Sequence, residues 1–387
     1  MNILMICDFF HEKQQYQENL LVKYYLKLGH DVTIVTSTIT SVFDYYSGNY
    51  DKNIKSHEYC LNGFTLIRLP FSINVLNKLR KLSKLKKVIN KIEPDLIYVH
   101  TAPLNISPAL SYKNKNKNCR VIFDSHADFS NSANNWMSLH LLHKIFYRII
   151  LNFLYKRIDK IYYVTPNGGE FLNKLYNIPH NKMELLPLGA DIDYINEINE
   201  KNTGNIIRKD LNIGLSDFVI FSGGKLTRAK KIELVIKAFL LLNEKNTHLI
   251  IIGDTKDKIY REEILTLINS HPRIHFIGWV DGQKAYDYMS ACDIAVFPAS
   301  QSVLWQQAIG SGLPLIIGQI EGQDVSYLNK NENIFMLEKD AIHEIEICNL
   351  ISLLYEDVNI LLSMKKNAIK TTNEFLSYDL ISKASIE

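Results

Sequence analysis

Residues 218–239 read FVIFSGGKLTRAKKIELVIKAF and carry the pattern that decides the fold. An apolar run of strand type ends in two glycines, and a cationic loop follows it. Apolar residues at 232, 235, 236 and 239 then recur with a helical period. The stretch therefore predicts a buried strand, a tight turn and an amphipathic helix in direct succession, which is the unit from which parallel sheets are built.

The same alternation of strand and helix extends in both directions along the chain. The strand-type runs are NILMIC, HDVTIVTS, DLIYVH, RVIFDS and KIYYVT before this stretch and HLIIIGD, RIHFIGW, DIAVFPA, LPLIIG and NIFML after it. A polar, weakly periodic segment at 193–216 interrupts the pattern. We therefore predict an α/β protein of two doubly wound, Rossmann-like domains facing a central cleft, over residues 1–195 and 196–370, with 371–387 as a helix that crosses back to the first domain.

Composition excludes several classes of protein. The chain has 387 residues and 47% hydrophobic content, which is enough for two full cores. A net charge of +3, without an interleaved strip of aromatic and basic residues, argues against nucleic acid as a partner. Five cysteines without a CxxC spacing indicate neither a disulfide framework nor a zinc site, and they fit a reducing cytoplasm.

The start of the chain, MNILMICDFF, has neither the basic residues nor the cleavage site of a secretory signal. No run approaches the ~18 apolar residues needed to span a bilayer. We expect a soluble or peripheral protein.

The glycine pair Gly223-Gly224 and the lysines Lys225 and Lys230 form a candidate anion site. Glycines let a polyphosphate approach the backbone, and ammonium groups on both sides of the loop can balance its charge. Such an arrangement suits a diphosphate leaving group. A solvated basic turn is the alternative, and the loop alone leaves both interpretations open.

His100 and His126 stand at the ends of successive predicted strands, DLIYVH and RVIFDS. A histidine can give or take a proton near neutral pH, and the carboxyl end of a parallel strand is where ligands of such sheets bind. The alternative is a structural histidine that caps a turn, but the position favours a functional role. A zinc site from His100, His126 and Asp128 lacks a ligand-spacing pattern, and we expect no metal.

Four segments, in the right order, resemble the retaining glycosyltransferases of the GT-B fold, in particular the family-four group. They are YQENLLVKYYLKLGHDVTIVTS, GGKLTRAKK, FIGWVDGQKAYDYMSACDIAVFPAS and AIGSGLPLI, and they span nearly the whole chain. The resemblance implies transfer of a sugar, of the hexosyl type, from a nucleotide-diphosphate donor to a glycan or lipid-linked acceptor. It implies retention, a role in assembling cell-surface polysaccharide or glycoconjugate, and no cofactor.

The resemblance also implies site residues. Lys225 stands where the family usually has arginine and Lys230 at its lysine, both on the donor diphosphate, and His100 is assigned to the reacting sugar. In this family retention is explained without a protein nucleophile, because cations and the helix beginning near Val303 stabilise the leaving diphosphate. The implied catalytic residues are His100, His126, Lys225 and Lys230, and the implied donor-binding residues are Gly223, Gly224, Gly278, Val280, Ser302, Val303, Gln306 and Gln307.

The sequence departs from the family at two acids. Gln307 stands in place of the second glutamate of the Glu-x7-Glu pattern, and Ala299 in place of the first. An amide can still accept hydrogen bonds from ribose hydroxyls and can also donate. Two alternatives therefore stay open, a non-catalytic nucleotide-sugar-binding relative and a nucleotide-sugar epimerase of the same fold.

Residues 74–92, NVLNKLRKLSKLKKVINKI, combine apolar residues at helical spacing, at 76, 79, 82, 85, 89 and 92, with seven lysines and arginines and no acid. The pattern predicts a basic amphipathic helix. Such a helix can rest on an anionic membrane, at its inner face in a cytoplasmic protein, or it can pack on its own sheet with a solvated basic face. The sequence of this segment favours neither the membrane-bound nor the sheet-packed interpretation.

Overall fold

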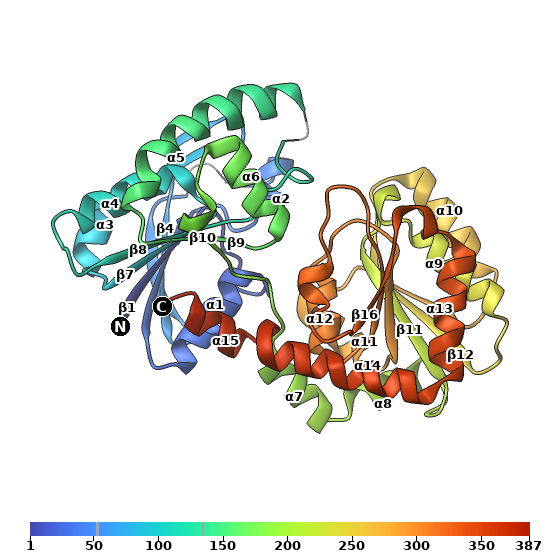
Figure 1. Ribbon diagram of the computed structural model, residues 1–387. Helices are drawn as coiled ribbons and strands as arrows, with labels where there is room; N and C mark the ends of the chain where they lie inside the picture. Colours follow the sequence, from blue (N-terminus) through green and yellow to red (C-terminus); the bar gives the residue numbers. More distant parts are fainter. Residues whose placement is uncertain (52–53, 134) are drawn as a thin grey trace. The chain divides into compact units, whose positions relative to one another are not determined.

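The computed structural model describes residues 1–51, 54–133 and 135–387. The chain divides into two compact units, of which the first comprises Met1–Pro187 with Ser382–Glu387 and the second comprises Leu188–Ile381 (Figure 1). Each unit is built on its own mainly parallel sheet covered by helices. The predicted fold class, α/β with two Rossmann-like domains, is confirmed.

The first unit has, within the described ranges, an eight-stranded sheet in the order β10-β9-β8-β7-β1-β2-β4-β3. Its neighbours pair in parallel except for the antiparallel pair β3–β4. The strands are β1 (Asn2–Cys7), β2 (Asp31–Ser37), β3 (His57–Leu61), β4 (Phe64–Leu69), β7 (Leu96–His100), β8 (Arg120–Ser125), β9 (Lys160–Tyr163) and β10 (Met183–Leu185). The strands predicted from NILMIC, HDVTIVTS, DLIYVH, RVIFDS and KIYYVT all form.

Helices cover both faces of this sheet, which explains why its central strands are continuous apolar runs. The helices are α1 (Gln17–Lys27), α2 (Val42–Ser47), α3 (Leu85–Ile92), α4 (Ile106–Lys113), α5 (Arg148–Leu154) and α6 (Pro166–Tyr176), with a π-helical segment, η2 (Ser138–Tyr147), leading into α5. Figure 1 shows α1 on one face and α3 to α6 on the other. Leu4 and Ile6 of β1 are fully buried against the second group.

The last residues of the chain pack on the first unit. α15 (Tyr378–Ala384) runs from the second unit into the segment Ser382–Glu387. The Tyr25 hydroxyl lies 2.6 Å from Ser385 Oγ, and the Tyr162 hydroxyl donates to the Ala384 carbonyl at 2.7 Å. These buried hydrogen bonds hold the terminus against α1 and β9.

The second unit has, among the described residues, a six-stranded sheet in the order β13-β12-β11-β14-β15-β16, with every pair parallel. The strands are β11 (Phe218–Lys225), β12 (Thr247–Asp254), β13 (Ile274–Gly278), β14 (Ile294–Phe297), β15 (Leu315–Gly318) and β16 (Ile334–Leu337). The helices are α7 (Ile192–Glu200), α8 (Thr203–Asp210), α9 (Ile232–Leu242), α10 (Lys258–Asn269), α11 (Gly282–Met289), α12 (Leu304–Gly310), α13 (Glu344–Glu356) and α14 (Val358–Thr371). The polar segment 193–216 thus carries α7 and α8 and belongs to this unit.

The prediction of one helix over residues 74–92 is wrong. Residues up to 82 form the antiparallel hairpin β5 (Phe71–Val75) and β6 (Leu79–Leu82), and only α3 is helical. The backbone turns at Leu76 and Asn77, both with positive φ, so strand pairing satisfies the groups that a helix would have used. The apolar spacing fits both structures because Leu82 of β6 and Ile89 of α3 are buried from two different elements, whereas Leu76 between the strands is exposed.

No single helix within the described residues is long and apolar enough to cross a membrane. The pair Glu344–Glu356 and Val358–Leu376 passes the test of length and composition only when taken together, and it is bent by 98°.

Candidate active site

Sequence-predicted residues of the first unit lie where its parallel strands end. His100 is the last residue of β7, and His126 follows β8. β7 pairs with β1 on one side and with β8 on the other, so Asp8, which follows β1, lies at the same edge of the sheet. The carboxyl ends of parallel strands are the usual place for a ligand in this fold class.

His100 is buried between two carboxylates. Its Nδ1 atom lies 2.8 Å from Asp124 Oδ2, and its Nε2 atom lies 3.4 Å from Glu18 Oε2. His126 lies edge-on to His100, with ring centroids 4.9 Å apart, and its Nε2 atom is 2.5 Å from Gln17 Oε1. The two predicted histidines are therefore brought together, with residues of the first turn of α1 facing both.

The carboxylates decide the charge of His100. Burial by itself would lower its pKa, but Asp124 and Glu18 raise the pKa to about 10. Burial likewise opposes the ionised form of Asp124, yet His100 and His126 hold its pKa well below the usual range. His100 is an imidazolium at neutral pH, so it acts as a hydrogen-bond donor and a fixed positive charge, not as a general base.

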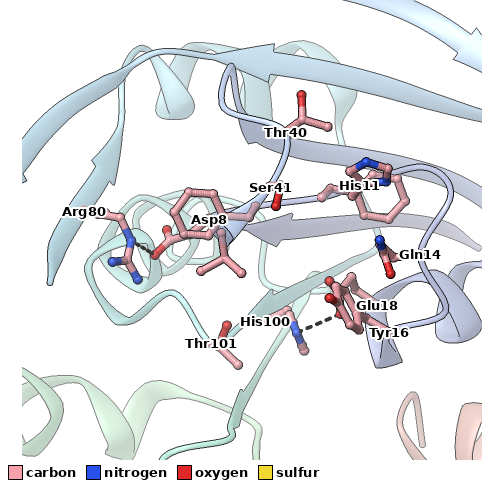
Figure 2. A pocket seen from close by; sticks show the side chains of 13 residues that line it. Asp8, His11, Gln14, Tyr16, Glu18, Thr40, Ser41, Arg80, His100 and Thr101 are labelled. Carbon is pink, nitrogen blue, oxygen red and sulfur yellow. Dashed lines mark hydrogen bonds and ion pairs between the residues drawn. The ribbon is translucent and has the colours of Figure 1, made fainter. Parts of the chain in front are cut away.

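A cavity of about 220 Å³ opens beside His100 (Figure 2). Asp8 and Arg80 meet on one side of it, where Arg80 Nε donates to Asp8 Oδ2 at 2.7 Å. Figure 2 shows Glu18, Tyr16 and His100 together on another side. The hydroxyls of Thr40, Ser41 and Thr101 also line the cavity. The lining thus offers paired charges and several hydrogen-bonding groups to a small polar ligand.

Sequence reasoning missed most of this cavity. Asp8, Glu18, Arg80 and Asp124 were not among the predicted site residues, although Asp8 and Asp124 carry the same signal as His100, a polar residue at the carboxyl end of an apolar strand. Arg80 gave no signal, because the segment that holds it was predicted to be helical. Its place in the cavity follows from the hairpin β5–β6.

The same residues can be tested for a metal. Ligand atoms of His100, Asp124 and His126 lie within 4.8 Å of one another, whereas Asp128, part of the zinc set considered in the sequence, accepts from the Ser130 and Asn131 amides instead. His100 Nδ1 faces Asp124, and the imidazole carries its proton at neutral pH. A metal would have to displace that proton and break the pair, so the donor set fits a hydrogen-bonded dyad better than a metal site.

The glycine turn of the second unit forms at the end of β11. A Cβ atom on Gly223 would lie 2.4 Å from the Ile252 carbonyl oxygen, so only glycine lets β11 approach β12 this closely. Gly224 has φ +120°, and a Cβ atom placed on it would lie 3.5 Å from Ser302 Oγ. Gly224 and Ser302, both predicted to bind the donor, are therefore neighbours.

Lys230 is partly buried and Lys225 is exposed. The Lys230 Nζ atom donates to the Ser300 carbonyl at 2.8 Å and to the Gln301 carbonyl at 2.5 Å. Burial lowers its pKa to about 8, and no carboxylate in the described part of the chain forms an ion pair with it. An ammonium has three N–H donors, so one remains for a ligand. Lys225, at the end of β11, has no side-chain partner among the described residues.

Gln306 and Gln307 differ in what their amides do. The Gln306 amide accepts from the Tyr327 hydroxyl at 3.0 Å and donates to the Ser302 carbonyl at 3.2 Å, so it braces the loop before α12. Gln307 Nε2 donates to the Gly282 carbonyl at 3.4 Å, but its buried Oε1 atom meets no donor among the residues described. A buried acceptor without a donor costs free energy, which a ligand hydroxyl would recover.

The remaining predicted donor-binding residues are Gly278 and Val280, at the carboxyl end of β13, and Val303, in the loop between β14 and α12. Gly278 ends β13 with φ +80°, and Val280 follows it, half-buried against the apolar core of the unit. Val303 is exposed just before α12. In the second unit Gly224 faces Ser302, and Lys230 binds the two carbonyls directly before Ser302, so the loops after β11 and β14 lie together.

Sequence comparisons agree with this architecture. Residues 19–194 match the model of Glycosyltransferase Family 4, and residues 217–357 match the model of Glycosyl transferases group 1. The first match covers most of the first unit and ends just inside the second, the other lies within the second unit, and together they span most of the chain. The chain therefore belongs to the family-4 type of glycosyltransferases and has the GT-B fold.

Individual relatives are distant. The uncharacterised glycosyltransferase MJ1059 of Methanocaldococcus jannaschii is 24% identical over 262 residues, which cover 64% of this chain and 60% of that protein. The lipopolysaccharide core biosynthesis glycosyltransferase LpsD of Rhizobium meliloti is 28% identical over 120 residues, 30% of this chain and 34% of LpsD. These alignments span less than two thirds of either relative.

A solved structure covers the whole chain. The crystal structure of HepE from Anabaena in complex with UDP-glucose superposes with a TM-score of 0.68 at 16% identity, over 100% of this chain and 98% of HepE. At this identity the likeness shows the fold.

Proposed function

We propose that this protein is a retaining glycosyltransferase that moves a hexosyl group from a nucleotide-diphosphate sugar to a glycan or a lipid-linked acceptor, in the assembly of cell-surface polysaccharide or glycoconjugate. The observation that carries the proposal is Lys230, a partly buried ammonium with carbonyl partners and no acid, beside Gly224 and Ser302. A cation that is partly withdrawn from water and has no counter-ion is a place for an anion.

In the proposed reaction the bond between the anomeric carbon and the donor diphosphate breaks, and a bond to the acceptor oxygen forms on the same face. The acceptor proton goes to the leaving diphosphate. Lys230 and Lys225 stabilise the charge that develops on the diphosphate, the Gln307 Oε1 atom accepts from a ribose hydroxyl, and His100 donates to the reacting sugar. His126 orients His100. No metal takes part.

The proposed location is the cytoplasm or the inner face of the cell membrane. All five cysteines are free, which suits a reducing compartment. Exposed lysines of α3, among them Lys86 and Lys87, add positive charge to the first unit, as binding to an anionic membrane requires.

A binding-only relative is the second candidate, because Ala299 and Gln307 replace the two acids of the family pattern. A panel of nucleoside-diphosphate sugars, each with candidate glycan and lipid-linked acceptors, separates the candidates. We expect release of nucleoside diphosphate that depends on an acceptor, and a product whose anomeric configuration, measured by NMR, matches the donor.

Two other outcomes would support the alternative candidates. A donor that stays intact while it stabilises the protein against heat, with the acceptor of its own pathway present, would make the protein a binding-only relative. Conversion of the donor sugar to an isomer without any acceptor would make it an epimerase.

A further inference from the structure

A stripe of large apolar side chains lies open to solvent on the helix formed by η2 and α5. Its members are Met137, Leu141, Ile145, Ile149 and Phe153, spaced four residues apart. Ile149 is 66% exposed and Phe153 is 77% exposed. A π-helix winds fewer turns per residue than an α-helix, so the π-helical turns of η2 keep the stripe on one face of the helix. We call this set the apolar stripe.

The helix is firmly packed on its other side. His143, Tyr147 and Leu151 are buried, and His143 lies within hydrogen-bond distance of the Tyr176 hydroxyl, 2.7 Å, and of the Ser132 carbonyl, 2.9 Å. Figure 1 shows this helix beside α6, on the face of the sheet that α3 and α4 also cover. The apolar stripe is therefore exposed although the helix is anchored. Contiguous apolar surface of this kind marks an interaction site.

A groove of about 820 Å³ continues the apolar stripe toward the hairpin β5–β6. Ile149 and Phe153 line this groove together with Leu79 and Leu104. At the tip of the same hairpin, Leu76 is 80% exposed. Two separate elements thus present unburied aliphatic side chains next to one another.

The segments that form this surface carry only positive charges. Residues 129–157 contain no aspartate or glutamate, and neither do residues 71–92. Lys81 and Arg157 line the groove, and Lys156 is exposed beside it. Apolar side chains bordered by cations, without acids, complement a lipid surface that is negatively charged outside and apolar beneath.

We propose that the apolar stripe and the hairpin tip dock the first unit on an anionic lipid bilayer. The apolar side chains enter the boundary between headgroups and acyl chains, to a depth of ~5–10 Å as amphipathic helices do, while the cations stay with the headgroups. A second copy of the chain is a poorer occupant, because two copies of this face would bring like charges together. The surface takes its hairpin tip from within residues 74–92, but its apolar stripe lies on η2 and α5, outside the helix that the sequence predicted there.

Docking here brings the membrane to the candidate active site. Successive residues of a strand point to opposite faces, and in β6 Leu79 and Lys81 line the groove while Arg80 lines the cavity beside His100. The groove and the cavity thus share one strand as a wall. If the proposed transferase function holds, this placement suits an acceptor whose sugar enters the cavity while its lipid stays in the bilayer.

Vesicle sedimentation of the full chain tests the docking without donor or acceptor, so its failure is separate from a failure of the proposed reaction. The probes are vesicles of phosphatidylcholine alone and of phosphatidylcholine mixed with phosphatidylglycerol. The test variant is Ile149→Glu with Phe153→Glu. The matched control is Leu215→Glu with Ile259→Glu, which changes second-unit residues that are 73% and 68% exposed. Thermal unfolding checks that both variants fold.

We expect the protein to bind the anionic vesicles and to be released by salt. The test variant should bind at least about tenfold more weakly, since it removes two side chains from the lipid and adds two negative charges. The control should bind like the wild type. The proposal is overturned if the wild type does not sediment with anionic vesicles at low salt, if both variants lose binding equally, or if Ile149 and Phe153 instead hold a stable dimer in solution.

Discussion

The two candidate sites hold positive charge in opposite ways, although Arg208, a buried cation elsewhere in the second unit, pairs with Asp293 at 2.9 Å. In the first unit each buried cation meets carboxylates, since His100 lies between Asp124 and Glu18, and Arg80 pairs with Asp8. In the second unit Lys230 meets only the carbonyls of Ser300 and Gln301.

The difference predicts the ligand of each unit. A cavity whose cations and carboxylates are already paired gains little from a charged ligand, but its carboxylates and hydroxyls can bind an uncharged ligand rich in hydroxyls, such as a sugar. A partly buried ammonium without an acid favours an anion, such as a diphosphate. The comparison thus divides the proposed reaction between an acceptor side and a donor side.

Asp124→Asn is expected to have the largest effect. It leaves the buried His100 imidazolium with Glu18 alone, and breaking a buried pair costs about 3–5 kcal/mol in free energy of unfolding. Urea unfolding at about pH 6 measures the change. Glu184→Gln, which breaks the exposed pair with Lys160, is the control and should cost at most about 1 kcal/mol. Equal stability of Asp124→Asn and the wild type would show that the first unit does not depend on paired charges.

The pH dependence of stability sharpens the same test. The folded pKa of His100, about 10, lies above the ~6.5 of an unfolded histidine. Its stabilising contribution is therefore complete below about pH 6.5 and is lost as the pH rises toward 10. The pKa of Asp124 is lowered, so its contribution is present above about pH 4 and is lost as the pH falls. We expect the difference between wild type and Asp124→Asn to be largest between these limits and smaller at about pH 9.

Lys230→Ala should come next, with a loss of about 2–5 kcal/mol in nucleoside-diphosphate binding. The partly buried ammonium of Lys230 is the charge that the diphosphate would meet. The exposed Lys225 is screened by water, so Lys225→Ala should lose at most about 1 kcal/mol. Isothermal calorimetry with UDP, GDP and ADP measures both variants. Unchanged nucleoside-diphosphate binding by Lys230→Ala would contradict the proposed difference between the two sites.

The pKa of Lys230 predicts a pH profile for the same binding. Burial lowers this pKa to about 8. A bound diphosphate favours the charged ammonium, so affinity should be constant below pH 8 and fall by up to about tenfold per pH unit above it. The Lys230→Ala variant should lack this fall.

Gln307→Ala should have the smallest effect, about 1–3 kcal/mol in nucleotide binding, because it removes one buried hydrogen-bond acceptor. Gln307→Met keeps the length of the side chain but has no amide, and it should lose as much nucleotide-binding free energy. Comparing the two variants separates the effect of the lost oxygen from the effect of a cavity. Gln307→Glu keeps an acceptor but sets a carboxylate oxygen against the Gly282 carbonyl, so it should bind nucleotide with a lowered melting temperature of the free protein. Normal binding by Gln307→Met would remove this residue from the donor site.

The contrast between the units also marks how far the sequence reached. In the second unit the glycines and Lys230 belong to one contiguous pattern of strand, loop and helix, and Gln307 belongs to a second such pattern after β14, so each residue could be placed near a strand end. In the first unit His100 and His126 could be placed at strand ends, but Asp8 and Arg80 are 72 positions apart, and their pairing depends on a hairpin that the helical period concealed.

Sequence alone determined the alternation of strands and helices outside the region of β3 to β6, the two α/β domains and the glycine turn after β11, because hydrophobic period and glycine tolerance are local properties of the chain. Tertiary structure decided which charges are buried together: Asp124 and Glu18 around His100, Asp8 against Arg80, and carbonyls around Lys230. It also decided that Ile149 and Phe153 face solvent while Tyr147 and Leu151 of the same helix are buried. Burial and pairing depend on which elements the sheet order brings side by side, and no local pattern carries that information.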